Sequence, residues 1–176
     1  MVQVVEAVVT DDARLLWPQL HGGITLGAPL TFQVIDYFKV GEGGYQSVGA
    51  SLEPRTPDPS LRRLAPDPLL QDIDIIVDTN RAAADKRYTP PGGLGFEVGT
   101  LTVADKSIQT PSTLRCLCSL AAGTGVGRNF WEIGLFSTHP DTTTYPGEKL
   151  MVAYGTFPLV VKGGTAMDFL VLVTWG

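Results

Sequence analysis

His139 is the histidine of this chain that lies closest to hydroxyl and carboxylate side chains, and it is therefore the first candidate for a general base. It stands in the run 137–141 (Ser-Thr-His-Pro-Asp), whose proline and aspartate are typical of a turn. A serine or cysteine nucleophile needs such a base within hydrogen-bond distance, and many hydrolases present the serine in a Gly-x-Ser-x-Gly turn. That turn motif does not occur in the sequence. We therefore expect no catalysis at His139 and predict that the protein is not an enzyme.

Four carboxylates could serve acid–base or metal chemistry: Asp72, Asp74, Asp78 and Glu132. The three aspartates are separated by even numbers of residues, so on a strand they share one face. A solvated outer face explains this spacing most simply. A calcium site is the alternative, because calcium prefers clustered carboxylate oxygens, although a flat strand does not wrap around an ion.

Cys116 and Cys118 are the only cysteines, and on a strand residues two apart point to the same side. A disulfide between them would be strained, so we interpret them as small buried apolar residues. A zinc site would need two further ligands, and only His21 and His139 are available, both in segments that contain Gly or Pro. We predict neither a metal site nor a cofactor.

A glycine-rich run, Gly123–Gly127, is the stretch most similar to a phosphate-binding loop. A Walker loop continues with Lys and then Ser or Thr, whereas Arg128 and Asn129 follow here. A dinucleotide-binding loop leads into a helix, but residues 130–136 have the composition of a strand. We interpret the run as a hairpin loop.

Composition and charge argue against nucleic-acid and membrane partners. The formal net charge is −5, and the basic residues are scattered, with adjacent pairs only at 62–63 and 86–87. No apolar run approaches the ~18 residues of a membrane span, and residues 1–10 lack the basic start of a signal peptide. Only 18% of the residues are charged, which is typical of a surface covered by other subunits.

Strand patterns dominate the sequence, since 20 glycines and 13 prolines interrupt it too often for long helices. Asp11 and Asp12 can cap one short helical turn that ends before Pro18. Beta-branched, aromatic or alternating apolar residues predict strands at Val2–Thr10, Leu30–Val40, Gln71–Asn80, Phe96–Val103, Leu114–Leu120, Trp131–Ser137, Lys149–Phe157 and Met167–Trp175. This number of short strands predicts one all-β domain over residues 1–176, a mainly antiparallel β-sandwich or barrel.

The segment Ser51–Pro68 is rich in proline, which cannot donate a ladder hydrogen bond. We therefore predict a long Pro-rich arm or loop that does not pair regularly. Long irregular loops in compact domains are usually functional or disordered, and in an assembly protein such an arm packs against a neighbour. We predict a subunit interface formed by Pro54, Arg55, Pro57, Pro59, Arg62 and Arg63.

Three short segments of the chain form a set of motifs. Residues 132–136 read Glu-Ile-Gly-Leu-Phe, residues 150–158 read Leu-Met-Val-Ala-Tyr-Gly-Thr-Phe-Pro, and residues 38–44 read Phe-Lys-Val-Gly-Glu-Gly-Gly. With the final apolar strand at 167–175, they resemble the collar-type domain of tail-fibre and tail-tip proteins of tailed bacteriophages. The residues that carry the resemblance are Gly41, Gly43, Gly44, Trp131, Glu132, Gly134, Phe136, Tyr154, Gly155, Phe157 and Pro158.

The resemblance implies an oligomeric, non-catalytic module of the virion, assembled in the host cytoplasm, that binds other virion proteins and copies of itself, with a trimer expected. Fibre proteins continue into a long shaft, whereas this chain ends at Gly176. We therefore expect a tail-tip, baseplate or fibre-anchoring module. The alternatives are a capsid decoration protein on the outer surface of the head, and a carbohydrate-binding module that would use exposed aromatic residues such as Trp131 and Tyr154. Because most aromatic residues fall on apolar faces, a host glycan is disfavoured.

Glu132 is the only charged residue of the motif segment 132–136. On a regular strand it points away from Trp131 and Ile133, to the side shared with Phe130 and Gly134. A carboxylate buried there would need a partner, such as backbone N–H groups or Arg128.

Overall fold

A computed structural model describes residues 2–14, 34–60, 99–101, 103–138 and 149–175 of the chain. Its strands are β1 (Val2–Val9), β2 (Ile35–Gly41), β3 (Tyr45–Val48), β4 (Ser51–Pro54), β5 (Gly99–Thr100), β6 (Lys106–Thr110), β7 (Thr113–Leu120), β8 (Asn129–Thr138), β9 (Lys149–Val161) and β10 (Met167–Thr174), with a 3-10 turn, η2, at Val103–Asp105. The predicted all-β class is confirmed. Within the described ranges there is no helix of the length and apolarity that a membrane crossing requires.

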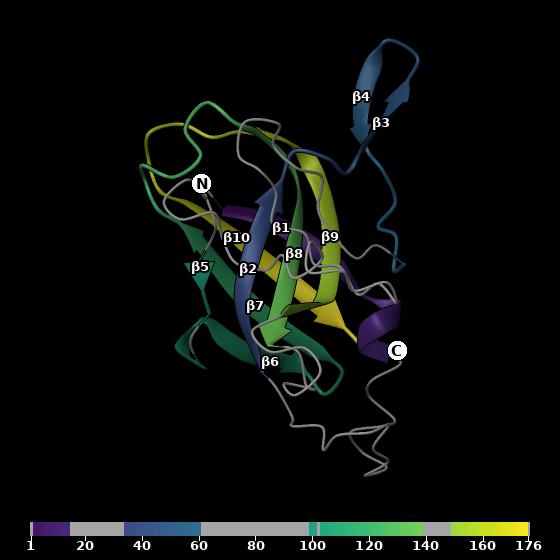
Figure 1. Ribbon diagram of the computed structural model, residues 1–176, viewed down its shortest axis with the longest axis vertical. Coiled ribbons are helices and arrows are strands. Elements are labelled where there is room, and N and C mark those ends of the chain that lie inside the picture. The colour runs from purple at the N-terminus through teal and green to yellow at the C-terminus, as the bar shows by residue number, and fades with distance from the viewer. Residues whose placement is uncertain (1, 15–33, 61–98, 102, 139–148, 176) are drawn as a thin grey trace, which may run out of the picture.

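Eight of these strands form one curled sheet in the order β5-β2-β8-β9-β1-β10-β7-β6, and β3 and β4 form a separate hairpin (Figure 1). Neighbouring strands are antiparallel except β1 and β10, which run parallel. The two edge strands, β5 and β6, follow each other in the chain with only residues 101–105 between them. Lys106 Nζ, at the start of β6, donates a hydrogen bond to the carbonyl oxygen of Ile35 on β2 (2.6 Å), so the opposite edges of the curled sheet meet.

The inside of the curled sheet is the hydrophobic core. Along β10, Met167, Phe169, Val171 and Val173 are buried, and they alternate with half-buried residues on the outer face. The ring of Phe169 packs against that of Phe157 on β9, with centroids 5.2 Å apart. This period of two is the pattern that predicted the strand, and β10 lies between β1 and β7 as expected for a central strand.

Most predicted strands are present, although several differ at their ends. For example, β9 continues past the predicted Phe157 to Val161. Strand β2 begins at Ile35 within the predicted Leu30–Val40, of which residues 30–33 lie outside the described residues. Of Phe96–Val103, only Gly99–Thr100 is described as a strand. The predicted strand Gln71–Asn80, with Asp72, Asp74 and Asp78, lies outside the described residues.

Two local predictions need correction. Residues 11–14 form a helical turn, but its cap is Thr10, whose hydroxyl accepts a hydrogen bond from the Ala13 amide (3.3 Å). The run Gly123–Gly127 is a turn, as predicted, with positive φ at Gly125 and Gly127. It does not close a hairpin, because it joins β7 to β8, and three strands separate these in the sheet.

Cys116 and Cys118 both point into the core from β7, are fully buried, and are free thiols, as their spacing predicts. Burial raises the pKa of Cys116 from 9.0 to about 11 and raises that of Cys118 as well. Burial and protonation both suppress thiol reactivity.

We expect neither cysteine of the native protein to react with a thiol reagent such as DTNB at pH 8, and both to react after unfolding in guanidinium chloride. Absorbance at 412 nm measures the reaction directly. Rapid labelling of the native protein would contradict this arrangement of β7.

Candidate functional site

The three motif segments meet at one place in the structure. Gly41 at the end of β2 pairs with Glu132 on β8, and Glu132 in turn pairs with Thr156 on β9. Tyr154 lies two residues before Thr156, on the same face of β9, because side chains on a strand alternate. Segments that are far apart in the sequence are therefore held side by side by the register of β2, β8 and β9.

The centre of this site is a hydrogen bond between two fully buried side chains. The hydroxyl of Tyr154 donates to Glu132 Oε2 over 2.6 Å, and both residues have 0% of their surface exposed. Burial, followed by the negative charge of Glu132, raises the pKa of Tyr154 well above its usual value. The tyrosine therefore stays protonated, so it serves as a hydrogen-bond donor and not as a nucleophile.

Arg55 completes the site from the other side of the tyrosine. Its Nη2 atom lies 3.5 Å from the Tyr154 hydroxyl oxygen, and its carbonyl oxygen accepts a hydrogen bond of 2.6 Å from the Thr156 hydroxyl. The Arg55 amide also donates to the carbonyl of Gly44 (2.9 Å). Arg55 is thus anchored within its own chain, and its place in a subunit interface stays a prediction.

The glycines of the loop between β2 and β3 allow the backbone to lie directly on Glu132. A Cβ atom at Gly41 would be 2.4 Å from Glu132 Oε1. At Gly44, whose φ is +80°, it would be 2.8 Å from Glu132 Cβ. Gly43 belongs to the same loop. A side chain at Gly41 or Gly44 would push the loop off the carboxylate, which explains the glycines of this motif.

The other motif residues lie outside this centre, on the same or neighbouring strands. A Cβ at Gly134 would be 2.8 Å from the Phe136 ring, and one at Gly155 would be 2.6 Å from Val5 Cγ1 on β1. Phe157 is buried in the core and Pro158 is exposed. Gly134 and Gly155 therefore allow close packing against these neighbours.

The prediction that Phe130 and Glu132 point to the same side of the strand is wrong. The ladder between β8 and β9 is irregular between Phe130 and Glu132, so strict alternation fails there. Phe130 joins the same core cluster as Ile133 and Leu135, whereas Glu132 bonds to Tyr154 on the other side of the sheet. Such irregularities cannot be read from the spacing of residues alone.

The start of the predicted Pro-rich arm is more regular than expected. Ser51–Pro54 forms β4 and pairs with β3. Pro54 is compatible with this pairing because it is the last residue of the strand. The carbonyl of Pro59 accepts a hydrogen bond of 2.8 Å from the Asp11 amide, and Pro57 is half-buried. Arg62 and Arg63, like residues 61–68 as a whole, lie outside the described residues.

Lys162 is a structural residue that no sequence motif marked. It is 1% exposed, and its ammonium group donates to the carbonyl oxygens of Ala122, Gly163 and Thr165. Its backbone also bonds to Gly127 and Arg128. It therefore ties the turn after β7 to the connection between β9 and β10. In the sequence, only its position directly after an apolar strand and before two glycines could have indicated this role.

The described residues hold no group of three or more His, Cys, Asp or Glu side chains that could bind a metal ion. His21 and His139 lie outside those residues. Trp131 is 5% exposed and Tyr154 is 0% exposed, so neither ring presents a face to a glycan. The Glu132–Tyr154–Arg55 site thus holds a loop and a strand together, and the side chains of Glu132 and Tyr154 are shielded from solvent. Comparisons of the chain with protein-family models, with curated proteins and with solved structures gave no match.

Proposed function

We propose that this protein is a structural component of a tailed-phage virion, acting as an oligomeric tail-tip, baseplate or fibre-anchoring module. The observation that supports this most is that all three segments of the phage-type motif contribute to one site, centred on Glu132. Because these segments contact one another, the motif describes a part of the fold. A resemblance between two structural modules is expected to lie in such a part. The proposed role needs no catalytic group.

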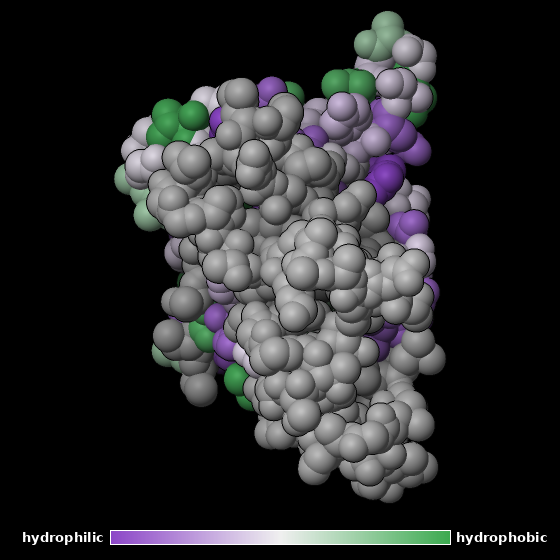
Figure 2. Space-filling view, viewed as in Figure 1, coloured by the Kyte–Doolittle hydropathy of each residue, from purple (hydrophilic) through white to green (hydrophobic). Residues whose placement is uncertain are grey.

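The hairpin formed by β3 and β4 gives this role a physical basis. It projects from the body of the molecule (Figure 1), and Figure 2 shows apolar side chains among the pale ones on it. Val48 and Leu52 are 48% and 51% exposed. A two-stranded hairpin is marginal in water by itself, so apolar side chains on a projecting one are typical of an arm that packs on a neighbour.

The base of this hairpin is held firmly. The ring of Tyr45 packs against that of Trp131 with centroids 5.3 Å apart, and Arg55 binds Gly44 and Thr156 directly after β4. An arm with a fixed base and an apolar tip can bind a neighbour with little loss of conformational entropy. This is a property that an anchoring module needs.

Immunogold labelling of intact virions with an antibody against this chain tests the proposal. We expect gold particles at the tail tip or baseplate. Labelling over the whole head would instead support the capsid-decoration alternative. Absence of the chain from purified virions, checked by mass spectrometry against a known tail protein as control, would contradict a structural role altogether.

A further inference from the structure

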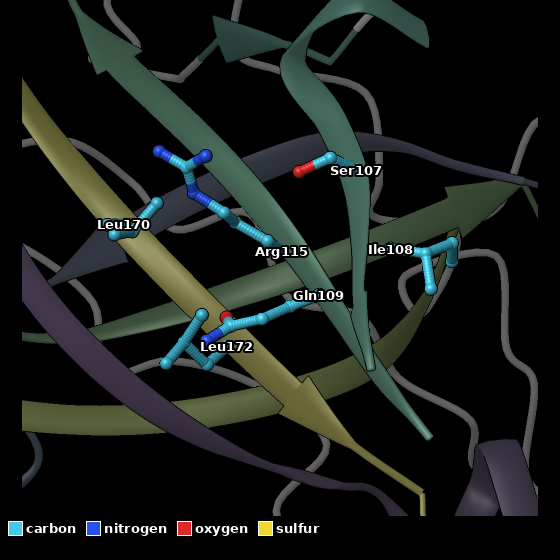
Figure 3. Close-up of a pocket in the computed structure, with 6 residues that line it drawn as sticks. All are labelled: Ser107, Ile108, Gln109, Arg115, Leu170 and Leu172. Carbon is cyan, nitrogen blue, oxygen red and sulfur yellow. The ribbon is translucent and has the colours of Figure 1, made fainter. Parts of the chain in front are cut away.

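The outer face of β1, β10 and β7 is largely apolar, and no described strand packs on it. In the register of these strands, Val4 lies beside Leu170, which lies beside Leu117. Val4 is 54% exposed, and both leucines are half-buried. The face continues to β6 as a shallow groove lined by Ser107, Ile108, Gln109, Arg115, Leu170 and Leu172 (Figure 3).

Two opposite charges lie at the ends of the next row on this face. Glu6 on β1 is level with Leu172 on β10, which is level with Arg115 on β7. Glu6 and Arg115 are both exposed, and neither forms an ion pair with another described residue. Neighbouring strands are about 4.8 Å apart, so the Cα atoms of Glu6 and Arg115 are about 10 Å from each other with an apolar residue between them.

We infer that this face binds a second copy of the same chain about a two-fold axis that runs along β10. Rotation about that axis places β1 of the partner over β7 and β7 of the partner over β1. Each Glu6 then lies opposite an Arg115, twice in the dimer, and Leu172 packs on its own copy. A self-complementary patch of this kind is what a two-fold contact requires, and two sheets pack face to face at about 10 Å.

Asp168 fixes where along β10 the contact is centred. It lies on the same outer face, two residues before Leu170, and accepts a hydrogen bond of 2.8 Å from the Ser119 hydroxyl. Two copies of this carboxylate would meet near the axis if the contact extended that far, and like charges repel. The contact is therefore centred on Leu172, at the end of the face where Glu6 and Arg115 lie.

Charge reversal tests this arrangement. We expect the native chain to sediment as a species with twice its 18.8 kDa mass. Glu6→Arg sets two arginines opposite each other and Arg115→Glu sets two glutamates opposite each other, so each change should raise the dissociation constant at least about tenfold. The double variant restores both pairs and keeps the net charge of −5, so its dissociation constant should return to near the native value.

Arg14→Glu is a suitable control, because Arg14 is exposed on the helical turn and its replacement changes the net charge as Arg115→Glu does. Analytical ultracentrifugation provides the masses, and circular dichroism verifies folding. A monomer at about 100 μM, a trimer unaffected by the reversals, or a double variant as weak as the single ones would overturn the inference.

The two-fold contact and the proposed function share only the expectation that the chain binds copies of itself. Experiments can therefore contradict one of them without the other. A dimer that shows charge rescue but is absent from virions would refute the virion role alone. If the chain is present in virions but its dissociation constant does not change with either charge reversal, the two-fold contact alone would be refuted. A two-fold pair also differs from the trimer that the phage resemblance implies.

Discussion

Replacing Tyr154 by phenylalanine is expected to lower the free energy of unfolding by about 3 kcal/mol, although only one oxygen atom is removed. The hydroxyl donates a hydrogen bond of 2.6 Å to the fully buried carboxylate of Glu132. Without it, Glu132 stays buried and loses a charge-assisted hydrogen bond, and the Arg55 guanidinium loses the hydroxyl oxygen that accepts its hydrogen bond. Chemical denaturation followed by the fluorescence of the tryptophans measures the change.

Tyr45→Phe is the matched control, because it removes the same atom from a ring that is 44% exposed. Its cost should stay within about 0.5 kcal/mol. A double-mutant cycle with Glu132→Gln then isolates the pair. If Tyr154→Phe costs as much in the Glu132→Gln background as in the native chain, the hydroxyl does not act through the carboxylate.

Gly155→Ala is expected to destabilise the protein by about 2–3 kcal/mol, because it inserts a methyl group where β9 and β1 are in contact. The new Cβ would be 2.6 Å from Val5 Cγ1 and 3.0 Å from the carbonyl oxygen of Glu6. The methyl of Val5 can be removed, whereas the backbone of β1 is held by its parallel pairing with β10. Thermal or chemical unfolding measures the loss.

Val5→Ala supplies the rescue. Alone it should also destabilise, since Val5 is buried in the core. Combined with Gly155→Ala, it opens the space that the new methyl needs. The double variant should therefore be destabilised by less than the sum of the two single variants, with a difference of about 1 kcal/mol or more. Gly123→Ala is the control, because nothing lies within 4 Å of a Cβ there. Strict additivity of the first pair would show that the methyl of Val5 is not the obstacle.

The strands were predictable wherever one face lines the core. β7 and β10 alternate buried and outer residues along their length, so their sequences carry a period of two. β6 was missed, because it lies at the edge of the sheet and its residues Ser107–Thr110 are all exposed. β3 was missed because both of its faces are exposed. Strands without a buried face lack the signal on which such prediction depends.

The site was predictable only in part. The need of Glu132 for a partner follows from elementary electrostatics, but the expected candidates were backbone groups or Arg128. The structure adds a partner that was not expected, Tyr154, which is 22 residues further along the chain. Arg55, separated from Tyr154 by 99 residues, bonds to the tyrosine hydroxyl in turn. Which strands are neighbours decides such contacts, and the spacing of residues within one strand does not contain that information.

The edges of the sheet also affect how this protein can assemble into larger structures. One segment, Gly99–Thr110, forms both edge strands of the described sheet, and these strands have only two and five residues. Short edge strands are a poor template for a strand from another molecule, so we do not expect copies to add one after another to a growing ladder. We expect association to use side chains on the outer face and on the projecting hairpin, where shape and charge limit the number of partners, and assemblies with a fixed number of subunits are the expected result.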